Sequence, residues 1–149
     1  MIKITDKIWL GSSHDAEHAD LKPDKITAIL SCVHDLEGKR GWTDGVEFAQ
    51  CGLVDGPGNT MAAYHAAVLR LAAFVLGGRK TLVHDHHGMS QAVFAVICVL
   101  QLLEGRMGWD HWLNVIKDKQ AILDGNPHEE HCKAFNRLNW RLLSSVLDG

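Results

Sequence analysis

Residues 80–91 read Lys-Thr-Leu-Val-His-Asp-His-His-Gly-Met-Ser-Gln, and the nine residues that follow, 92–100, are all apolar. This order predicts a short buried strand, a tight loop at the glycine and then a long apolar helix. Such a unit forms an anion cradle, because the N–H groups of the loop and of the first helical turn point at one spot. The stretch therefore predicts both a strand-loop-helix unit and a binding pocket at its loop.

Further strands and helices are expected on both sides of this unit. Strands are predicted at 2–4, 8–10, 27–33, 46–53 and 80–84, and helices at 14–21, 60–76, 90–104 and 109–123, followed by one last helix. The strands come first, alternate with helices in the middle and give way to helices alone. This order predicts an α/β fold with a central, mostly parallel sheet flanked by helices.

Two helix starts carry their own signals. Asn59 is expected to cap the helix 60–76. Asn126 and Pro127 are expected to be the cap and the first residue of the last helix. The apolar face of this last helix is expected to hold Phe135, Leu138, Leu142 and Val146.

Length and composition narrow the class of protein. At 149 residues without a repeat or a linker, the chain is expected to form a single domain, 1–149. Its formal charge of −3 provides no basic surface, so neither nucleic acid nor a membrane is an expected partner. Four irregularly spaced cysteines, with no secretory signal, indicate reduced thiols and a cytoplasmic location.

Three segments, in order, resemble the dual-specificity phosphatases, which are cysteine-dependent phosphatases of the protein-tyrosine-phosphatase type. Residues 8–12, Ile-Trp-Leu-Gly-Ser, are similar to the first strand and turn of that family. Residues 55–59, Asp-Gly-Pro-Gly-Asn, resemble the loop that carries its general acid, and 84–91 resemble its phosphate-binding loop, His-Cys-x-x-Gly-x-Ser-Arg. The resemblance continues to the tail with Asn126 and Pro127, and it implies a protein-tyrosine-phosphatase-like fold over nearly the whole chain.

Two substitutions fall on positions that carry the chemistry of that family. Its cysteine attacks phosphorus, its arginine holds the phosphate oxygens, and its aspartate protonates the leaving oxygen. Here Asp85 stands at the nucleophile position and Gln91 at the arginine position, while Asp55 stands at the general-acid position. A carboxylate at the base of the cradle repels a phosphate dianion and takes up the amides itself, and Gln91 brings no charge. Both changes argue against cysteine-type phosphatase activity.

The neighbouring positions each have a structural and a functional interpretation. Asp55 is either a retained acid or a side chain that bonds the amides of its own turn. Ser90, which by resemblance steadies the thiolate, is expected mainly to cap the following helix. Gly88 is expected to supply a positive φ or a close backbone approach.

The loop histidines are expected to line a ligand-binding surface together with Gly88 and Met89. By resemblance, His84 braces the loop through hydrogen bonds, whereas His86 and His87 are expected to be exposed. With Asp85 they also provide zinc-type ligands, but adjacent side chains diverge, so neither a metal site nor a cofactor is expected. His128 and His131, three residues apart, are expected to mark a solvated helix face.

Three hypotheses follow for function. The first is a catalytically impaired relative, a pseudophosphatase, which binds a protein or small molecule at the pocket of the 85–91 loop and acts as a monomer. The second is a repurposed enzyme, with or without the help of a metal ion, that uses Asp85, Asp55 and the loop histidines as acids, bases or ligands. The third is an inactivated or engineered form of an active protein phosphatase.

Overall fold

The computed structural model describes residues 1–18, 25–34, 46–87, 90–119 and 126–148. It has a five-stranded sheet in the order β1-β2-β5-β3-β4, in which β1 runs antiparallel to β2 and the other pairs are parallel. The strands are β1 (Ile2–Lys3), β2 (Ile8–Gly11), β3 (Ala28–Ser31), β4 (Glu47–Gln50) and β5 (Thr81–His84). The mostly parallel α/β sheet expected from the sequence is therefore confirmed.

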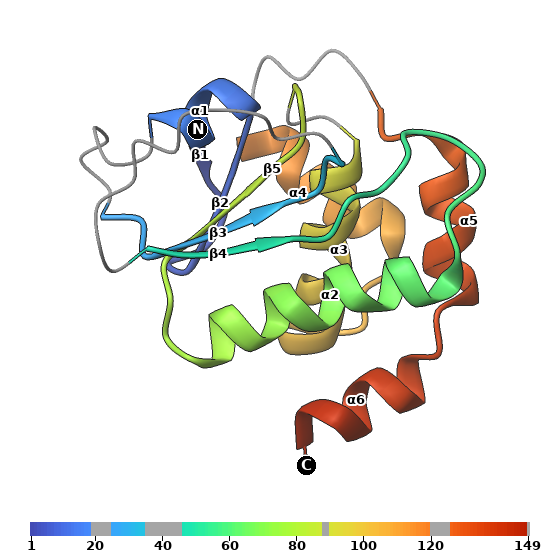
Figure 1. Cartoon of the computed structure of the whole chain (residues 1–149). Coiled ribbons are helices and arrows are strands. Elements are labelled where there is room, and N and C mark those ends of the chain that lie inside the picture. Colours follow the sequence, from blue (N-terminus) through green and yellow to red (C-terminus); the bar gives the residue numbers. More distant parts are fainter. Residues whose placement is uncertain (19–24, 35–45, 88–89, 120–125, 149) are drawn as a thin grey trace.

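The helices cover the two faces of this sheet unequally (Figure 1). Their bounds are α1 (Ser13–Glu17), α2 (Met61–Leu76), α3 (Gln91–Leu103), α4 (Trp109–Lys119), α5 (Glu129–Arg137) and α6 (Trp140–Asp148). The larger core lies between the sheet and α2 to α5 and also takes in Leu143 of α6, whereas α1 packs on the opposite face over a small cluster around Trp9. Among the described residues, no helix is both long and apolar enough to cross a membrane.

Alternation along the strands explains the two cores. In β5 the side chain of Leu82 joins the small cluster and that of Val83 joins the large one, because successive side chains of a strand point to opposite faces. Both are fully buried, as are the flanking Thr81 and His84. A strand covered on both faces shows a continuous apolar run rather than a polar alternation.

Two helix starts differ from the sequence prediction. The cap of α2 is Thr60, whose hydroxyl accepts the N–H of Ala63 at 3.1 Å. Asn59 instead braces the preceding turn, since its side chain accepts the N–H of Val54 and donates to the carbonyl of that residue, each at 2.8 Å. Helix α5 is capped by His128, so Asn126 and Pro127 precede the cap.

The last helix is not continuous. Leu138 has an extended backbone with ψ of 145°, which ends α5. Asn139 then caps a new helix, because its side chain accepts the N–H of Leu142 at 3.0 Å. Leu142 and Val146, expected on a packed face, are 50% and 52% exposed on α6. The single last helix expected from the sequence is therefore wrong.

Candidate functional site

A cavity of about 390 Å³ opens at the carboxyl end of β5, where the chain passes from the strand into α3. Ligands of parallel sheets bind at this edge. Its lining consists of Asp55, Asp85, His86, His87, Ser90, Gln91 and Asn126. The structure therefore brings the 55–59 turn and the 84–91 loop to one cavity. Gly88 and Met89, which the sequence also places at this surface, lie outside the described residues.

Asp85 fills the amide cradle that the sequence predicts. Its Oδ1 accepts the N–H of His87 at 3.1 Å, and its Oδ2 accepts those of Ser90 and Ala92 at 3.1 and 3.0 Å. The side chain is only 2% exposed. Ala92 is the second residue of α3, so the carboxylate caps this helix from five residues before its cap position. A phosphate that approached these amides would have to displace a buried anion.

Gln91 occupies the first position of α3 and is 8% exposed. Its side-chain Nε2 donates to the carbonyl of Leu53 at 3.3 Å, on the segment that continues from β4. The amide therefore ties the start of α3 to the 55–59 side of the cavity. It is neutral and supplies none of the charge that a guanidinium would bring to a bound dianion.

Asp55 and Ser90 join the two sides of the cavity. The Ser90 hydroxyl donates to Asp55 Oδ1 and accepts the N–H of His128 at 3.0 Å. Ser90 stands at the cap position of α3, but its side chain makes no capping bond, so the expected serine cap is wrong. Of the two interpretations of Asp55, a retained acid or a brace of its own turn, the second role is taken by Asn59. The side chain of Asp55 is 53% exposed and accessible from the cavity.

His131 extends this network into the core, and the sequence analysis missed it. The residue is fully buried on α5. Asn59 donates to the Tyr64 oxygen at 3.1 Å, and the Tyr64 hydroxyl lies 2.9 Å from His131 Nδ1. If the hydroxyl donates its proton to Nδ1, Nε2 carries the ring hydrogen. Nε2 lies 3.4 Å from Asp55 Oδ1, close enough for electrostatic contact but without hydrogen-bond geometry.

Burial sets the charge state of this imidazole. Burial lowers the pKa of His131 below its ordinary value, although the nearby carboxylate of Asp55 acts in the opposite direction. A signal for this burial was present in the sequence. His131 precedes the buried Phe135 by four residues, so both lie on the apolar face of α5. The solvated face expected for His131 is therefore wrong.

The three histidines of the 84–87 tract lie in different environments. His84 is fully buried, its Nδ1 lies 3.3 Å from the carbonyl of Asp85, and burial lowers its pKa. Its Nε2 has no hydrogen-bond partner among the described residues. His86 and His87 are exposed at the cavity. Within the described part of the chain, the donor atoms of this tract do not converge on a metal position.

The comparisons with known proteins give a clear result for structure. No model of a known protein family matches the sequence, and no curated protein is similar to it in sequence. The solved structure of DUSP15 matches with a TM-score of 0.80 at 24% identity, covering 99% of this chain and 94% of that chain.

Two further structures are similar. A mouse putative dual specificity phosphatase, solved as a complex with zinc tungstate, has a TM-score of 0.79 at 16% identity, with coverage of 98% of this chain and 90% of that chain. A human tyrosine phosphatase-like serine/threonine/tyrosine-interacting protein has a TM-score of 0.77 at 18% identity, with coverage of 92% and 93%. The chain therefore has the fold of the dual-specificity and tyrosine phosphatases, as its sequence motifs predict.

Proposed function

We propose that this chain is a catalytically impaired relative of the dual-specificity phosphatases, which binds a protein or a small molecule at the cavity of the 85–91 loop. One observation carries the proposal. The carboxylate of Asp85 accepts three N–H groups from the loop and from the start of α3, the groups that the strand-loop-helix unit would offer to an anion. The cradle is thus occupied by the protein's own side chain.

The charges around the cavity favour a particular class of ligand. Among its described lining residues are two aspartates, Asp55 and Asp85, but no lysine or arginine. At 4 Å, two like charges repel by about 4 kcal/mol at the effective dielectric constant of a protein surface. A phosphate dianion is therefore a poor ligand. A ligand that presents hydrogen-bond donors or a positive charge to Asp55 fits this cavity better.

The name of one structural neighbour describes such a role. The human protein with 18% identity is called tyrosine phosphatase-like and serine/threonine/tyrosine-interacting, so its name refers to an interaction. We extend that role to this chain on the strength of its own cavity. As part of the same proposal, the protein acts as a monomer in the cytoplasm, where its four unpaired cysteines would stay reduced.

Hydrolysis of an aryl phosphate tests this proposal. Purified protein is expected to release no more phenolate than a heat-denatured control, and Asp85→Ala is expected to leave that rate unchanged. Turnover above the control that is lost in Asp85→Ala would contradict the proposal, because the carboxylate would then be a working nucleophile. The matched control is Asp110→Ala, at an acidic residue of α4 outside the cavity. An equal loss of activity in this variant would point to a contaminating phosphatase that differs between preparations.

A second candidate function is a repurposed acid–base enzyme. The observation that favours it is the contact of Asp55 with both the Ser90 hydroxyl and His131 at the wall of the cavity. A buried imidazole beside a carboxylate is an arrangement that catalytic sites use. This hypothesis predicts a bell-shaped pH–rate profile, with or without added divalent ions, and loss of the activity in Asp55→Asn. A flat profile on aryl esters and aryl phosphates would contradict it for those substrates.

The third candidate, an inactivated form of an active phosphatase, rests on the retained surroundings of the two substituted positions. Asp55, Ser90 and the strand-loop-helix unit remain together at the cavity. Restoring the cysteine and the arginine tests whether the rest of the cavity still supports phosphate chemistry.

A further inference from the structure

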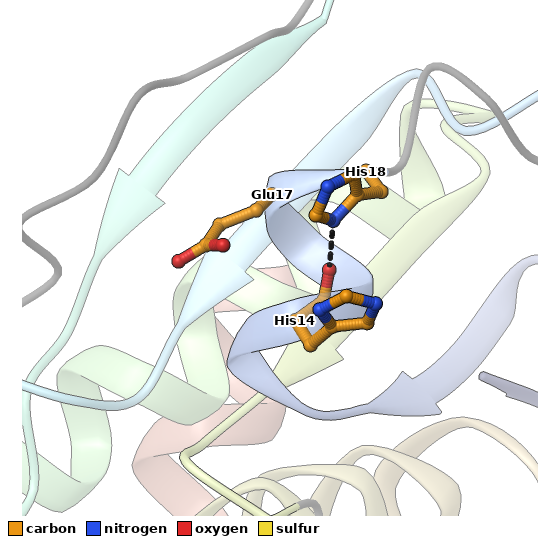
Figure 2. Close-up of side chains that lie close together, drawn as sticks. All are labelled: His14, Glu17 and His18. Carbon is orange, nitrogen blue, oxygen red and sulfur yellow. Dashed lines mark hydrogen bonds between the residues drawn. The ribbon is translucent and has the colours of Figure 1, made fainter.

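Helix α1 and its cap residue His18 carry two histidines and a glutamate on one turn, beside the cavity described above but not among its lining residues. His14, Glu17 and His18 follow the spacing i, i+3, i+4, which places all three on adjoining parts of one helix surface. One donor atom of each side chain lies within 4.8 Å of those of the other two. Figure 2 shows the two imidazole rings beside each other on this turn, with Glu17 extending from the same turn.

One of the histidines is already held as a metal ligand would be. His18 Nδ1 lies 2.9 Å from the carbonyl oxygen of His14 (Figure 2). A carbonyl accepts only, so Nδ1 carries the hydrogen and Nε2 keeps a free lone pair. Histidine ligands of metals usually donate their second N–H to a carbonyl or carboxylate in this way, which fixes both tautomer and ring orientation. The two rings lie against each other, with centroids 4.4 Å apart.

The turn that carries these donors is anchored in the fold. Ser12 and Asp15 form a capping box, and the N-terminal amino group lies 3.2 Å from Asp15 Oδ1. Ala16 is fully buried in the small cluster around Trp9. The backbone below the three donors is therefore fixed on the side that faces the sheet, while His14 is exposed and Glu17 and His18 are half-buried. A site with a fixed backbone loses little conformational entropy when an ion binds.

We propose that His14, Glu17 and His18 bind one divalent transition-metal ion of the borderline class, such as Zn²⁺. Two imidazole nitrogens and a carboxylate oxygen are ligands that this class prefers. Ligand atoms around a tetrahedral Zn²⁺ lie about 3.3 Å apart, given bond lengths of about 2.0–2.2 Å. The three donors therefore have to close by at most about 1.5 Å, which rotation of the exposed His14 and the half-buried Glu17 side chains provides. A water molecule would complete the tetrahedral coordination.

The proposed site is next to the cavity but does not depend on it. Ser13, which precedes His14, donates its hydroxyl to the carbonyl of Asp85 at 3.3 Å and its N–H to that of His86 at 3.4 Å. The turn that would hold the ion is thus bonded to the backbone of the loop. None of its three donors lines the cavity, so the metal proposal stands whether or not the cavity binds a ligand.

Metal titration of the full chain tests the proposal. Protein freed of metal with a chelator is titrated with Zn²⁺ by calorimetry and with Co²⁺ by visible absorption. We expect one ion per chain, d–d bands of bound Co²⁺ and a melting temperature that rises with Zn²⁺ concentration. His14→Gln and His18→Gln should each weaken Zn²⁺ binding more than about tenfold. Mutation of a residue that only hydrogen-bonds to a metal ligand already costs about that much, and loss of the ligand itself should cost more.

The controls separate this site from other histidines. His111→Gln, an exposed histidine of α4, should bind Zn²⁺ as the wild type does. Glu17→Gln keeps the size of the side chain but removes its charge. Weaker Zn²⁺ binding in this variant would support the carboxylate as a ligand even if a histidine variant were to unfold. No saturable binding, or unchanged binding in folded His14→Gln and His18→Gln, would overturn the proposal. Binding lost only in the double variant His86→Gln, His87→Gln would also overturn it, because the ion would then sit at the loop.

Discussion

Two carboxylates line the same cavity and have opposite surroundings. Asp85 is 2% exposed and accepts three backbone N–H groups from the described residues, whereas the side chain of Asp55 is 53% exposed and contacts a hydroxyl and an imidazole. Asp85 therefore stabilises the fold, since it caps α3 and bonds the backbone of its own loop. Asp55 stays available to a ligand. The hydrogen bonds around an aspartate, and not the residue type alone, therefore decide whether it stabilises the fold or remains available to a ligand.

The largest effect is expected from restoring the family's residues on the Asp85 side. Asp85→Cys combined with Gln91→Arg frees the amides and returns a nucleophile and a positive charge to the cavity. We expect hydrolysis of an aryl phosphate to rise at least about 100-fold above wild type, since a single transition-state donor is worth about 10²–10³. Initial rates of phenolate release measure this increase.

The Asp55 side provides the control for that experiment. In the restored enzyme, Asp55→Asn should lower the rate by about 10²-fold if Asp55 protonates the leaving group. The single variant Gln91→Arg should stay inactive, since the cradle remains occupied by Asp85. A folded double variant without activity would show that the cavity has diverged beyond these two positions.

The next largest effect concerns stability. Asp85→Ala removes the acceptor of two buried N–H groups and one partly buried N–H group, and should lower the free energy of unfolding by about 2–4 kcal/mol. Asp55→Ala removes a partly exposed side chain and should cost less than about 1 kcal/mol. Urea unfolding of both variants measures the difference. Equal losses would contradict the division into a structural and an available carboxylate.

The smallest effect is a pH dependence that arises on the Asp55 side. The pKa of His131 is lowered in the folded chain, so below about pH 6.5 the unfolded chain takes up a proton that the folded chain does not. The stability is therefore complete above that pH and is lost as the pH falls toward the folded pKa. His131→Gln should reduce the loss between pH 7.5 and 5.5 by about 0.5–1 kcal/mol.

Urea midpoints at several pH values measure this difference. Some dependence should remain in the variant, because burial also lowers the pKa of His84. The control His111→Gln should keep the wild-type dependence, since this histidine is exposed on α4. An unchanged slope in His131→Gln would show that the imidazole contributes no proton linkage.

The sequence predicted the sheet and the strand-loop-helix unit closely, because buried strands and apolar helices have strong local signals. It did not predict which side chains cap the helices. Serine before an apolar run is the local signal for a cap. At α3 that role is taken instead by Asp85, five residues before the cap position. The bond from the Ala92 N–H to Asp85 depends on the tertiary structure around the loop, which a local sequence pattern does not predict.

The end of the chain shows a second limit. An apolar residue recurs every three or four positions from Phe135 to Val146, so the period continues across the break at Leu138 and Asn139. Only the capping side chain of Asn139 marks the new helix. His131 is buried because it lies on the same helix face as Phe135, whereas its three-residue spacing to His128 predicts a solvated face.

Oxyanion binding tests the central claim, that Asp85 occupies the cradle in place of an anion, most directly. Wild type and Asp85→Ala are titrated with inorganic phosphate and with tungstate while the melting temperature is followed. The account predicts no shift for wild type, and for Asp85→Ala a saturable rise that recovers part of the lost stability, because the anion replaces the carboxylate at the freed amides. Saturable stabilisation of wild type, with none in a folded Asp85→Ala, would contradict it.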